Sequence, residues 1–471
     1  MARDPAARVR DRDDACPGTV DAAVGDDGLI ARIRLPGGRV TGRQLRVLAA
    51  CSQELGKGFV DLTVRANAQV RGLSEAGIRE LGARLADAGL FPSPTHDRVR
   101  NIAASPFAGR DPDALVDADR LTAALDAALC AVPELAALPG RFQFAVDDGG
   151  LRVATRRHDV ALAAVAGGVV ELRLAGMATG RYADTPDAAV ALAVAAARAF
   201  LRARESNGAW HVRELPGGGE GLARLLGDFA PTLPDVGTAA GNRLHDSRSS
   251  ERTGPVVGVV PQADGRMAVS ALVPLGRLSY TQLVTLADLL ESSEVDVAGG
   301  VGVPSTRETG SGMRLRIAAW RGVVVGDIPR AAADVVAVLD AAGLPCDPDS
   351  GWLGVSACSG VGECRRASVD VRSLAREFAT EQCGLGAVHF VACERACGRP
   401  ARAALVVADK TADDAPQRFT VTAERPEIAE GVRTAVAELR LSGSIPPADC
   451  ATGDSTRSGS NSPERHPWTT G

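Results

Sequence analysis

Apolar and polar positions near the start of the chain change their period from element to element. After a polar stretch of about twenty residues, GLIARIRL predicts a strand, which a Pro36-Gly37-Gly38 turn separates from a helix capped by Thr41. The next segment, FVDLTVRANAQVRGL, alternates apolar and polar residues like a strand with one solvated face. Apolar residues at helical spacing then predict a helix capped by Ser74. We expect a strand–helix–strand–helix unit.

The same order of elements recurs after residue 255. The segment DGRMAVSALVPLGRLSYTQLVTLADLL aligns with the first copy, and MRLRIAAWRGVVV corresponds to FVDLTVRANAQVRG before a helix that we expect Asp327 to cap. The matched positions are Arg39-Val40-Thr41 with Arg277-Leu278-Ser279, Gln44-Leu45 with Gln282-Leu283, and Leu48-Ala49 with Leu286-Ala287. We interpret this as an internal duplication, with chance similarity as the alternative.

Two further regions mix helices and strands. Between the copies, we expect helices at about 114–131 and 187–206 around several strands, and then a loop or linker rich in Gly, Pro and Ser from Leu215 to Gly254. After the second copy, the strands GWLGVSAC, HFVAC and ARAALVVAD alternate with helices at about 365–379 and in EIAEGVRTAVAELRL. The tail from about Pro446 is polar, and we expect it to be disordered.

Composition narrows the possible functions. A length of 471 residues suggests two or three compact units. No run of 18 apolar residues and no apolar leader occurs, so we expect a cytoplasmic protein without membrane insertion. A net charge of −5 and 3% aromatic residues argue against nucleic acid as a partner. Only Lys57 and Lys410 are lysines among 53 basic residues, so a single arginine is weak evidence of function.

Four cysteines carry the strongest chemical signal. Cys358 and Cys364 form C-x5-C, and Cys393 and Cys397 form C-x3-C after a gap of 28 residues. Two loops that each give two thiolates can surround one iron–sulfur cluster, and the glycines around them let N–H groups approach its sulfides. The alternatives are structural zinc, for which C-x5-C is long, and free buried thiols. We interpret Cys51, Cys130 and Cys346 as core residues, whereas Cys383 is a possible substitute ligand.

Duplicated α+β units followed by C-x5-C and by CERACGRP resemble the nitrite and sulfite reductase superfamily, which joins a [4Fe–4S] cluster to a siroheme. The resemblance implies that Cys358, Cys364, Cys393 and Cys397 bind the cluster, with Cys397 linking it to the macrocycle's metal. It also implies an α+β fold with duplicated ferredoxin-like half-modules and α/β modules around a central ligand cleft. The expected units are 1–95 and 255–340 for the half-modules, 96–240 for the first α/β module, 341–445 for the cluster-binding module, and 446–471 for the tail.

Within the superfamily, the opening CPG and the segments LTVRANAQVRGL, RNIAASPFAGRD, LPGRFQFAVDDGG and WRGVVV resemble the precorrin-3B synthase family of aerobic cobalamin biosynthesis. This likeness implies a monooxygenase-type oxidoreductase that hydroxylates precorrin-3A with dioxygen and forms a lactone from an acetate arm. It further implies a [4Fe–4S] cluster and a mononuclear non-haem iron, whose ligands the sequence does not identify. Because no GxGxxG dinucleotide motif is evident, we expect a separate reductase or ferredoxin as electron donor.

One departure separates this family from the reductases that it resembles. Reductases of the superfamily usually follow LP with R-K-F-K, whereas this chain has Gly140, Arg141, Phe142 and Gln143. Reduction of sulfite or nitrite needs positive charge and proton delivery at the anion, so the loss of a lysine favours the synthase. The alternatives are a siroheme-dependent sulfite or nitrite reductase and, in another class, a non-catalytic iron–sulfur carrier or a zinc-stabilised scaffold.

A tetrapyrrole fringed by carboxylates needs several cations and N–H donors in its site. We expect arginines in the matched segments to supply them, aided by nearby amides, although a surface arginine or a capping amide is the alternative for each. We expect Arg65, Asn67, Gln69 and Arg71 to alternate on one face of a strand. The full set of candidate substrate-binding residues is Arg65, Asn67, Gln69, Arg71, Arg100, Asn101 and Arg141.

Overall fold

The computed structural model describes residues 14, 16–150, 153, 158–227, 254–295, 312–329, 331–381, 386–400, 403–409, 418–424 and 426–441. These residues form four mixed units of helices and strands, each with its own sheet, which confirms the predicted α+β class. Within the same ranges, the structure contains no helix with the length and apolar character needed to span a bilayer. The predicted disordered tail and Cys383 lie outside the described residues.

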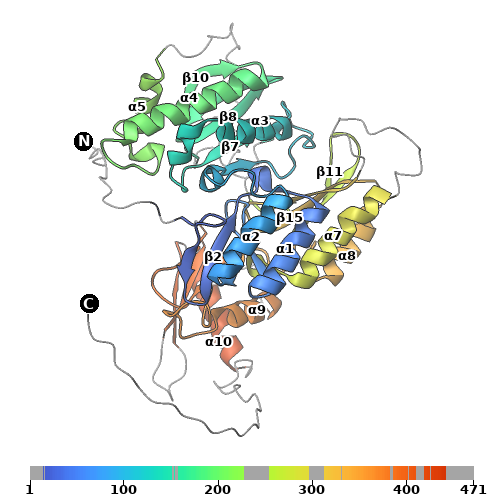
Figure 1. Ribbon diagram of the computed structural model, residues 1–471. Coiled ribbons are helices and arrows are strands. Elements are labelled where there is room, and N and C mark those ends of the chain that lie inside the picture. The colour runs from blue at the N-terminus through green and yellow to red at the C-terminus, as the bar shows by residue number, and fades with distance from the viewer. Residues whose placement is uncertain are drawn as a thin grey trace, which may run out of the picture.

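The first half, as we call the unit built around residues 23–88, is a five-stranded antiparallel sheet covered by two helices (Figure 1). Its strand order is β1 (Ala23–Gly25), β2 (Gly28–Ile33), β5 (Ala68–Leu73), β4 (Phe59–Leu62) and β13 (Arg277–Ser279). The helices are α1 (Gly42–Leu55) and α2 (Glu75–Asp87). Thr41 forms a reciprocal capping box with Gln44 at the start of α1, and Ser74 accepts from the Gly77 N–H in α2, so both predicted caps are confirmed.

The second half, built around residues 258–341, repeats this plan. Its sheet has the order β11 (Gly258–Pro261), β12 (Met267–Leu272), β15 (Gly322–Ile328), β14 (Arg314–Ile317) and β3 (Arg39–Val40), and its helices are α7 (Tyr280–Val295) and α8 (Ala332–Ala341). The two halves exchange edge strands, because β13 pairs with β4 of the first half and β3 pairs with β14 of the second. Each sheet is therefore completed by the other copy.

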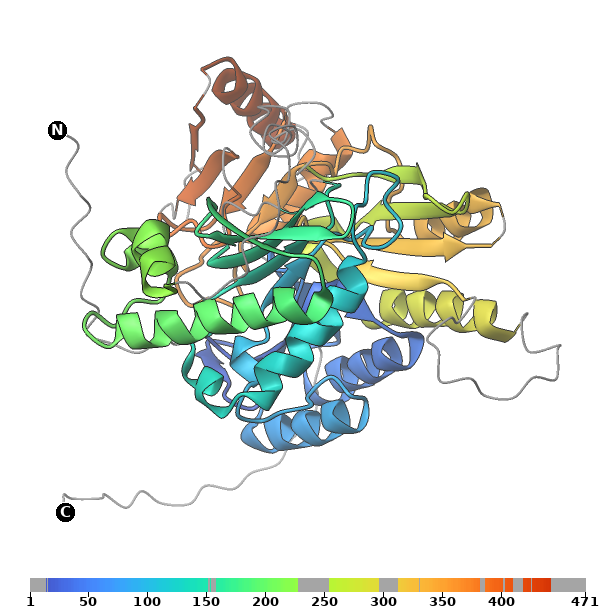
Figure 2. The same ribbon diagram turned by 90° about the horizontal axis from the view of Figure 1, so that it is seen from above.

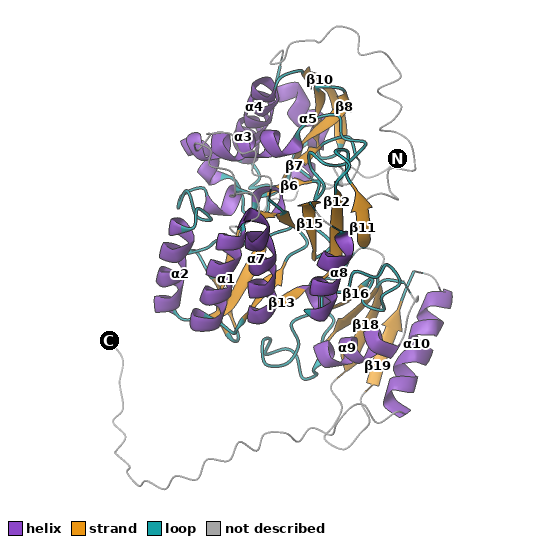
Figure 3. Cartoon of the chain, turned by 90° about the vertical axis from the view of Figure 1, so that its right-hand side faces the viewer, coloured by secondary structure: helices purple, strands orange, loops and turns teal. Residues whose placement is uncertain are grey.

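The packing supports the duplication at the level of single side chains. Gln44 bonds to the Thr41 N–H and donates to the Ala88 carbonyl, and Gln282 bonds to the Ser279 N–H and donates to the Ala342 carbonyl. One hydrophobic core runs through both halves, and helices α2, α1 and α7 stand in a row beside the sheets (Figure 3). Leucines at equivalent positions of α1 and α7 are fully buried in it, and burying one leucine contributes about 2 kcal/mol.

The first module lies against the halves at the top of the view in Figure 1, and its long helix α4 crosses the molecule when seen from above in Figure 2. Its sheet has the order β10 (Met177–Ala183), β9 (Val169–Leu174), β8 (Val160–Ala166), β7 (Phe144–Asp147) and β6 (Ile102–Ala104), with β6, β7 and β8 parallel. Its helices are α3 (Ala118–Ala131), α4 (Pro186–Arg204) and α5 (Gly218–Leu225). Helix α5 lies in the segment predicted to be a linker, whose remainder, 228–253, is outside the described residues.

The cysteine module lies at the opposite end of the molecule from the first module (Figures 1 and 3). Its sheet has the order β16 (Val355–Ala357), β17 (Val388–Val391), β18 (Ala404–Asp409) and β19 (Arg418–Thr422), and its helices are α9 (Val371–Glu381) and α10 (Pro426–Leu441). Helix α9 begins later than the predicted residue 365. The Asp370 carboxylate accepts from the N–H groups of Arg372 and Ser373 and so fixes the start of the helix.

The alternating segment FVDLTVRANAQVRGL is a hairpin and not one strand. Between β4 and β5, the Thr63 hydroxyl accepts hydrogen bonds from the N–H groups of Arg65 and Asn67, and Ala66 adopts a left-handed φ of 55°. Alternation continues through the turn, so its period could not reveal the reversal. The prediction that Arg65, Asn67, Gln69 and Arg71 share one strand face is therefore wrong.

The predicted cap of the helix that closes the second copy is also wrong. Helix α8 begins after Ala331, and no side chain caps it. Asp327 instead ends β15 in a left-handed conformation, where both of its carboxylate oxygens accept from the Arg110 guanidinium of the first module. Arg110 holds the pKa of this carboxyl below its usual value despite burial. Asp327 therefore joins the second half to the first module and does not cap a helix.

Candidate functional site

The two cysteine loops start side by side. Strands β16 and β17 are parallel neighbours, and Cys358 and Cys393 follow their carboxyl ends, with the Cys358 N–H donating to the Phe390 carbonyl at 2.9 Å. Because carboxyl ends of parallel strands meet at one edge of a sheet, the fold brings together segments that are 28 residues apart in sequence. Cys364 and Cys397 follow a few residues later in the same two loops, so both pairs lie near this edge.

Cys358 is half-buried at this edge of the sheet. Burial raises the pKa of Cys358, although the backbone N–H groups of Gly360 and Ala392 favour its thiolate form and so lower its pKa. The neighbouring Cys393 and Cys397 also raise the pKa because adjacent thiolates repel each other. A cationic metal core between these sulfurs would relieve that repulsion.

The donor set fits an iron–sulfur cluster in chemistry and in topology. All eight cysteines of the described residues are free, and Cys358, Cys364 and Cys393 are half-buried whereas Cys397 is exposed. Within the described ranges, no group of three or more His, Cys, Asp or Glu side chains is arranged around a point where one metal ion would sit. A cubane cluster spreads its thiolates around a core of iron and sulfide, so its ligands lie further apart than those of one ion. Cys358, Cys364, Cys393 and Cys397 could hold such a cluster.

A charge network joins the first cysteine loop to both halves. Glu363, next to Cys364, accepts from Arg277 of β13 at 2.6 and 2.9 Å, and its carbonyl accepts from Arg71 of β5 at 3.1 Å. Arg277 also bonds to Asp61, and Arg71 to Asp27. All of these groups are largely buried, so each carboxylate compensates a desolvated guanidinium. The network fixes the loop at the junction of the halves.

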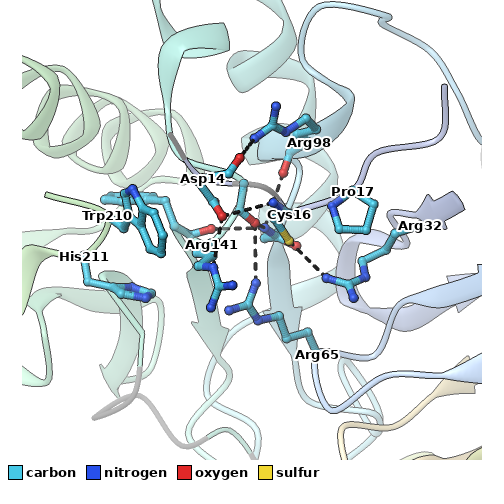
Figure 4. A network of polar contacts seen from close by, with 12 residues as sticks. Asp14, Cys16, Pro17, Arg32, Arg65, Arg98, Arg141, Trp210 and His211 are labelled. Carbon is cyan, nitrogen blue, oxygen red and sulfur yellow. Dashed lines mark hydrogen bonds and ion pairs between the residues drawn. The ribbon is translucent and has the colours of Figure 1, made fainter. Parts of the chain in front are cut away.

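A second cluster of charge, the arginine pocket, lies between the first half and the first module (Figure 4). Cys16 is buried there, and its sulfur accepts from Arg32 Nη1 at 3.0 Å and from Arg34 Nη2 at 3.7 Å. Within the described part of the chain, Arg32 Nε and Arg34 Nη1 are buried and lack a hydrogen-bond partner. Burial lowers the pKa of Arg34 to about 10. A buried donor without an acceptor costs about 1–3 kcal/mol, so these groups indicate a place for an anionic acceptor.

Three side chains converge on one carbonyl at the edge of this pocket. The Gly140 oxygen accepts from Asn101 Nδ2 at 2.6 Å, from Arg65 Nη1 at 3.4 Å and from Arg34 Nη2 at 3.5 Å. Burial lowers the pKa of Arg65, and the nearby positive charges of Arg32 and Arg141 lower it further. Like charges gathered in this way repel one another until an anion joins them. A cavity of about 400 Å³ opens beside the pocket, lined in part by Asp14 and Arg98.

Comparison with known proteins agrees with this architecture. Residues 23–88 match the family model described as the nitrite/sulfite reductase ferredoxin-like half domain. The chain is 42% identical over 88 residues to a ferredoxin–nitrite reductase of Leptolyngbya laminosa, which is 18% of this chain and 17% of the relative. It is 25% identical over 378 residues to a sulfite reductase [ferredoxin] of Mycobacterium tuberculosis, covering 74% and 62%. The chain is therefore similar to members of the nitrite and sulfite reductase superfamily.

Two further matches add detail within that superfamily. A precorrin-3B synthase of a Sinorhizobium species is 29% identical over 136 residues, 29% of each chain. The structure of the Mycobacterium tuberculosis NirA protein shares the fold, with a TM-score of 0.56 and 21% identity over 88% of this chain and 78% of that one. The matches span 17%, 29% and 62% of the first three relatives, which is less than two thirds of their length.

Five of the predicted substrate-binding residues gather at the arginine pocket. Arg65 and Asn101 contact Gly140, Asn67 donates to Asn101 at 3.2 Å, and Gln69 accepts from Arg32 at 3.1 Å. Arg141 donates to Asp14 at 3.0 Å. That they touch a substrate stays a prediction.

The other two predicted residues are not part of this pocket. Arg71 is engaged with Asp27 and Glu363 in the network at the first cysteine loop. Arg100 makes a bidentate ion pair with Asp126 of α3, at 2.7 Å for each bond, and is almost fully buried. Both guanidinium groups are therefore committed to the protein's own carboxylates.

Sequence reasoning missed the centre of the pocket. The segment GLIARIRL, which contains Arg32 and Arg34, predicts only a strand. The i, i+2 spacing of these two arginines nevertheless places them on one face of it. Cys16 is part of the CPG segment that resembles the synthase family, but nothing in its local sequence indicates contact with the arginines. The signal that could have found them is this pair of charges on an otherwise apolar strand, because a buried strand face does not carry two arginines without partners.

Proposed function

We propose that this protein is a precorrin-3B synthase, which hydroxylates the acidic macrocycle precorrin-3A with dioxygen and closes a lactone from an acetate arm. Cys358, Cys364, Cys393 and Cys397 would hold a [4Fe–4S] cluster. When bound, that cluster supplies one-electron transfer. The 29% identity to a precorrin-3B synthase over 136 residues supports this assignment, and so does the chemistry of the pocket.

The observation that carries the proposal is the state of the segment Gly140–Gln143. Arg141 is bound by Asp14 and lies over the Trp210 ring at 5.1 Å, so its charge is shared with a carboxylate and an aromatic face. Gln143 brings no charge to the position where the reductases have a lysine. An oxyanion that must be protonated and reduced finds neither a free cation nor an ammonium proton donor in this segment.

The pocket suits a ligand with several carboxylates instead. Guanidinium groups bind carboxylates in a planar, two-pronged geometry, and Arg32, Arg34 and Arg65 come from two adjacent segments of the first half. Their roles would be to bind and orient acetate or propionate arms, with Asn67 and Asn101 holding the arginines and the Gly140 carbonyl in place. Orientation of the acetate arm matters because it must reach the hydroxylated carbon.

The proposed activity also requires an electron donor. Electrons would come from a separate carrier, and several relatives are named as ferredoxin-dependent reductases, so a ferredoxin is the donor we propose. The likeness to the synthase family implies a mononuclear non-haem iron as a second cofactor. We place the protein in the cytoplasm, as expected from the sequence.

A siroheme-dependent sulfite or nitrite reductase is the second candidate. The observation that favours it is coverage, because the match to the sulfite reductase extends over 74% of this chain and the match to the synthase over 29%. Both activities would use the same cysteine loops. They differ in whether the tetrapyrrole is a product-forming substrate or a retained cofactor.

The test is to purify the protein without air, then supply precorrin-3A, isotopically labelled dioxygen and a reductant, and analyse the macrocycle by mass spectrometry. We expect a product that carries labelled oxygen and loses the signature of a free acetate arm. The Cys393→Ser variant serves as the matched control and should give no product. Formation of sulfide from sulfite by protein that retains siroheme bands would reject the synthase and establish the second candidate.

A further inference from the structure

The second cysteine loop is held at two consecutive carbonyl groups. His389, on β17, donates from Nε2 to the Cys397 carbonyl at 3.1 Å, and Arg321, in the turn between β14 and β15, donates from Nη2 to the Gly398 carbonyl at 3.3 Å. Cys397 is the most exposed of the four cysteines and lies in a loop without strand pairing. These two hydrogen bonds are therefore the tethers that reach this part of the loop from two different units.

The tautomer of His389 follows from its partners. A carbonyl can only accept, so Nε2 carries the proton, and Nδ1 accepts from the Ser356 hydroxyl at 2.9 Å. The ring is fully buried, and burial lowers the pKa of His389 to about 4, helped by the positive charges of Arg321 and Arg399. Both nitrogens of the imidazole are thus committed to hydrogen bonds within the protein. Its role is positional.

The backbone around these contacts is shaped for close approach. Gly398 has a left-handed φ of 82°, and a Cβ there would come within 3.1 Å of Arg321 Nη2. Arg321 itself has a φ of 63°, and within the described residues its Nε is buried without a partner. A left-handed arginine is strained and persists only where the surroundings require it. Here the conformation aims the guanidinium of the second half at the loop of the cysteine module.

We propose that His389 and Arg321 are positioning residues that fix the peptide at Cys397 and thereby set the stability and the electronic properties of the cluster. The inference rests on the proposed cluster, because it assigns a role toward that group. Outer-shell hydrogen bonds orient metal ligands, and losing one typically weakens a site by about 10- to 100-fold. Since Arg321 belongs to the second half, contact between that half and the cysteine module would influence the stability of the cluster.

The chain offers a matched control for His389. His96 is also buried, with Nε2 at 3.0 Å from the Val132 carbonyl and Nδ1 at 3.0 Å from the Ser93 hydroxyl, in the first module's region and away from the cysteine loops. His389→Leu and His96→Leu therefore remove the same kind of hydroxyl–imidazole–carbonyl bridge. His389→Gln keeps an N–H donor at the same distance along the side chain and should rescue the tether.

The experiment measures iron and sulfide content, the electron paramagnetic resonance spectrum of the reduced protein, and the rate at which the visible cluster absorbance bleaches in air. For His389→Leu and Arg321→Met, we expect bleaching about tenfold faster than wild type and an altered resonance spectrum. His389→Gln and His96→Leu should stay within about twofold of wild type. If His389→Leu does not fold, Arg321→Met decides the question in its place.

The outcomes are distinguishable. Wild-type protein that carries iron and sulfide, together with tether variants whose bleaching rate and spectrum match those of wild type and His96→Leu, would overturn this inference and leave the proposed function intact. Wild-type protein prepared without air that holds no iron or sulfide would overturn the proposed function and the inference together. Faster bleaching in both histidine variants would assign the effect to general destabilisation and would also reject the positional role.

Discussion

The two halves are built on one plan, yet their hairpin turns meet different chemistry. In the first half, Arg65 of the β4–β5 turn donates to the Gly140 carbonyl of the first module at 3.4 Å. In the second, Arg321 of the β14–β15 turn donates to the Gly398 carbonyl of the cysteine module at 3.3 Å. Each turn also holds a residue in the left-handed region, Ala66 or Arg321. The two copies thus place equivalent arms at different sites, one at the arginine pocket and the other at the second cysteine loop.

The surroundings of the two turns differ in how their charges are balanced. Near the first turn, Arg32, Arg34 and Arg65 outnumber the carboxylates that contact them, and two buried N–H groups of the described residues lack acceptors. Near the first cysteine loop, the arginines are matched by Asp27, Asp61 and Glu363. A pocket with excess positive charge favours binding of an anionic ligand. A network whose arginines are matched by carboxylates has a structural role instead.

The largest effect should come from removing a cluster ligand, which separates the two sites most sharply. Cys393→Ser replaces a thiolate by a poor iron ligand, and we expect nearly complete loss of bound iron and sulfide. The arginine pocket should be unaffected, so the affinity for uroporphyrin III, a carboxylate-fringed probe, should stay within about twofold by calorimetry. Cys130→Ser, at a half-buried cysteine outside the loops, is the control and should retain the cluster. Equal iron content in both variants would contradict the assignment of Cys393.

The next largest effect compares equivalent glycines of the two halves. Gly38 and Gly276 have φ values of 70° and 67°; a Cβ on Gly38 would overlap the Ile317 carbonyl oxygen, whereas one on Gly276 would lie 2.6 Å from the Arg321 side chain. Left-handed alanine plus a backbone clash should lower the free energy of unfolding by about 3 kcal/mol for Gly38→Ala, and by about 1–2 kcal/mol for Gly276→Ala.

Denaturant unfolding measures both losses, and cluster bleaching adds a second readout. Gly276→Ala should speed bleaching because it displaces Arg321, while folded Gly38→Ala should bleach at the wild-type rate. The reverse pattern would show that the exchanged edge strands, and not the Arg321 arm, govern the cysteine loop.

A middle-sized effect should appear at the pocket. Arg34→Met removes a buried guanidinium with an unpartnered N–H within the described residues, and relief of its desolvation offsets the loss of its bonds to Cys16 and Gly140, so the ligand-free protein should lose little stability. The affinity for uroporphyrin III should fall about tenfold, since a charged hydrogen bond contributes about 1.5–3 kcal/mol. Arg79→Met, on the exposed face of α2, is the matched control. An unchanged affinity in Arg34→Met would remove the pocket from the binding site.

The smallest effect concerns the turn residues themselves. Ala66→Gly relieves a left-handed alanine but adds freedom to the unfolded chain, so we expect the free energy of unfolding to rise by at most about 1 kcal/mol. Arg321→Gly relieves the same backbone strain but removes the hydrogen bond to the Gly398 carbonyl. We expect its free energy of unfolding to rise slightly and its cluster to bleach faster than in wild type. Thermal unfolding and bleaching of the two variants, measured together, check this. A large stability change in Ala66→Gly would mean that the turn carries more than local strain.

The elements that were predictable are those whose signals are local. Thr41 with Gln44, and Ser74, identify helix starts because capping needs only neighbouring residues. The repeated glutamines and leucines reveal the duplication for the same reason. The paired cysteines point to a metal centre because the two residues of each pair are close in sequence.

The features that were not predictable depend on contacts between distant segments. The arginine pocket joins residue 16 to strand β2 and to residue 140, and the exchange of β3 and β13 joins the two copies. Asp327 looked like a cap because Arg110, its partner, is 217 positions away. Arg71 and Arg100 looked like free cations because nothing in their own segments discloses Asp27, Glu363 or Asp126 as partners.

The central claim is that Cys358, Cys364, Cys393 and Cys397 hold one [4Fe–4S] cluster, and analysis of iron, zinc and acid-labile sulfide in wild-type protein prepared without air tests it most directly. We expect about four iron and about four sulfide per chain, with a brown absorbance that reduction bleaches. One zinc per chain with no sulfide, or protein free of both metals, would contradict the claim.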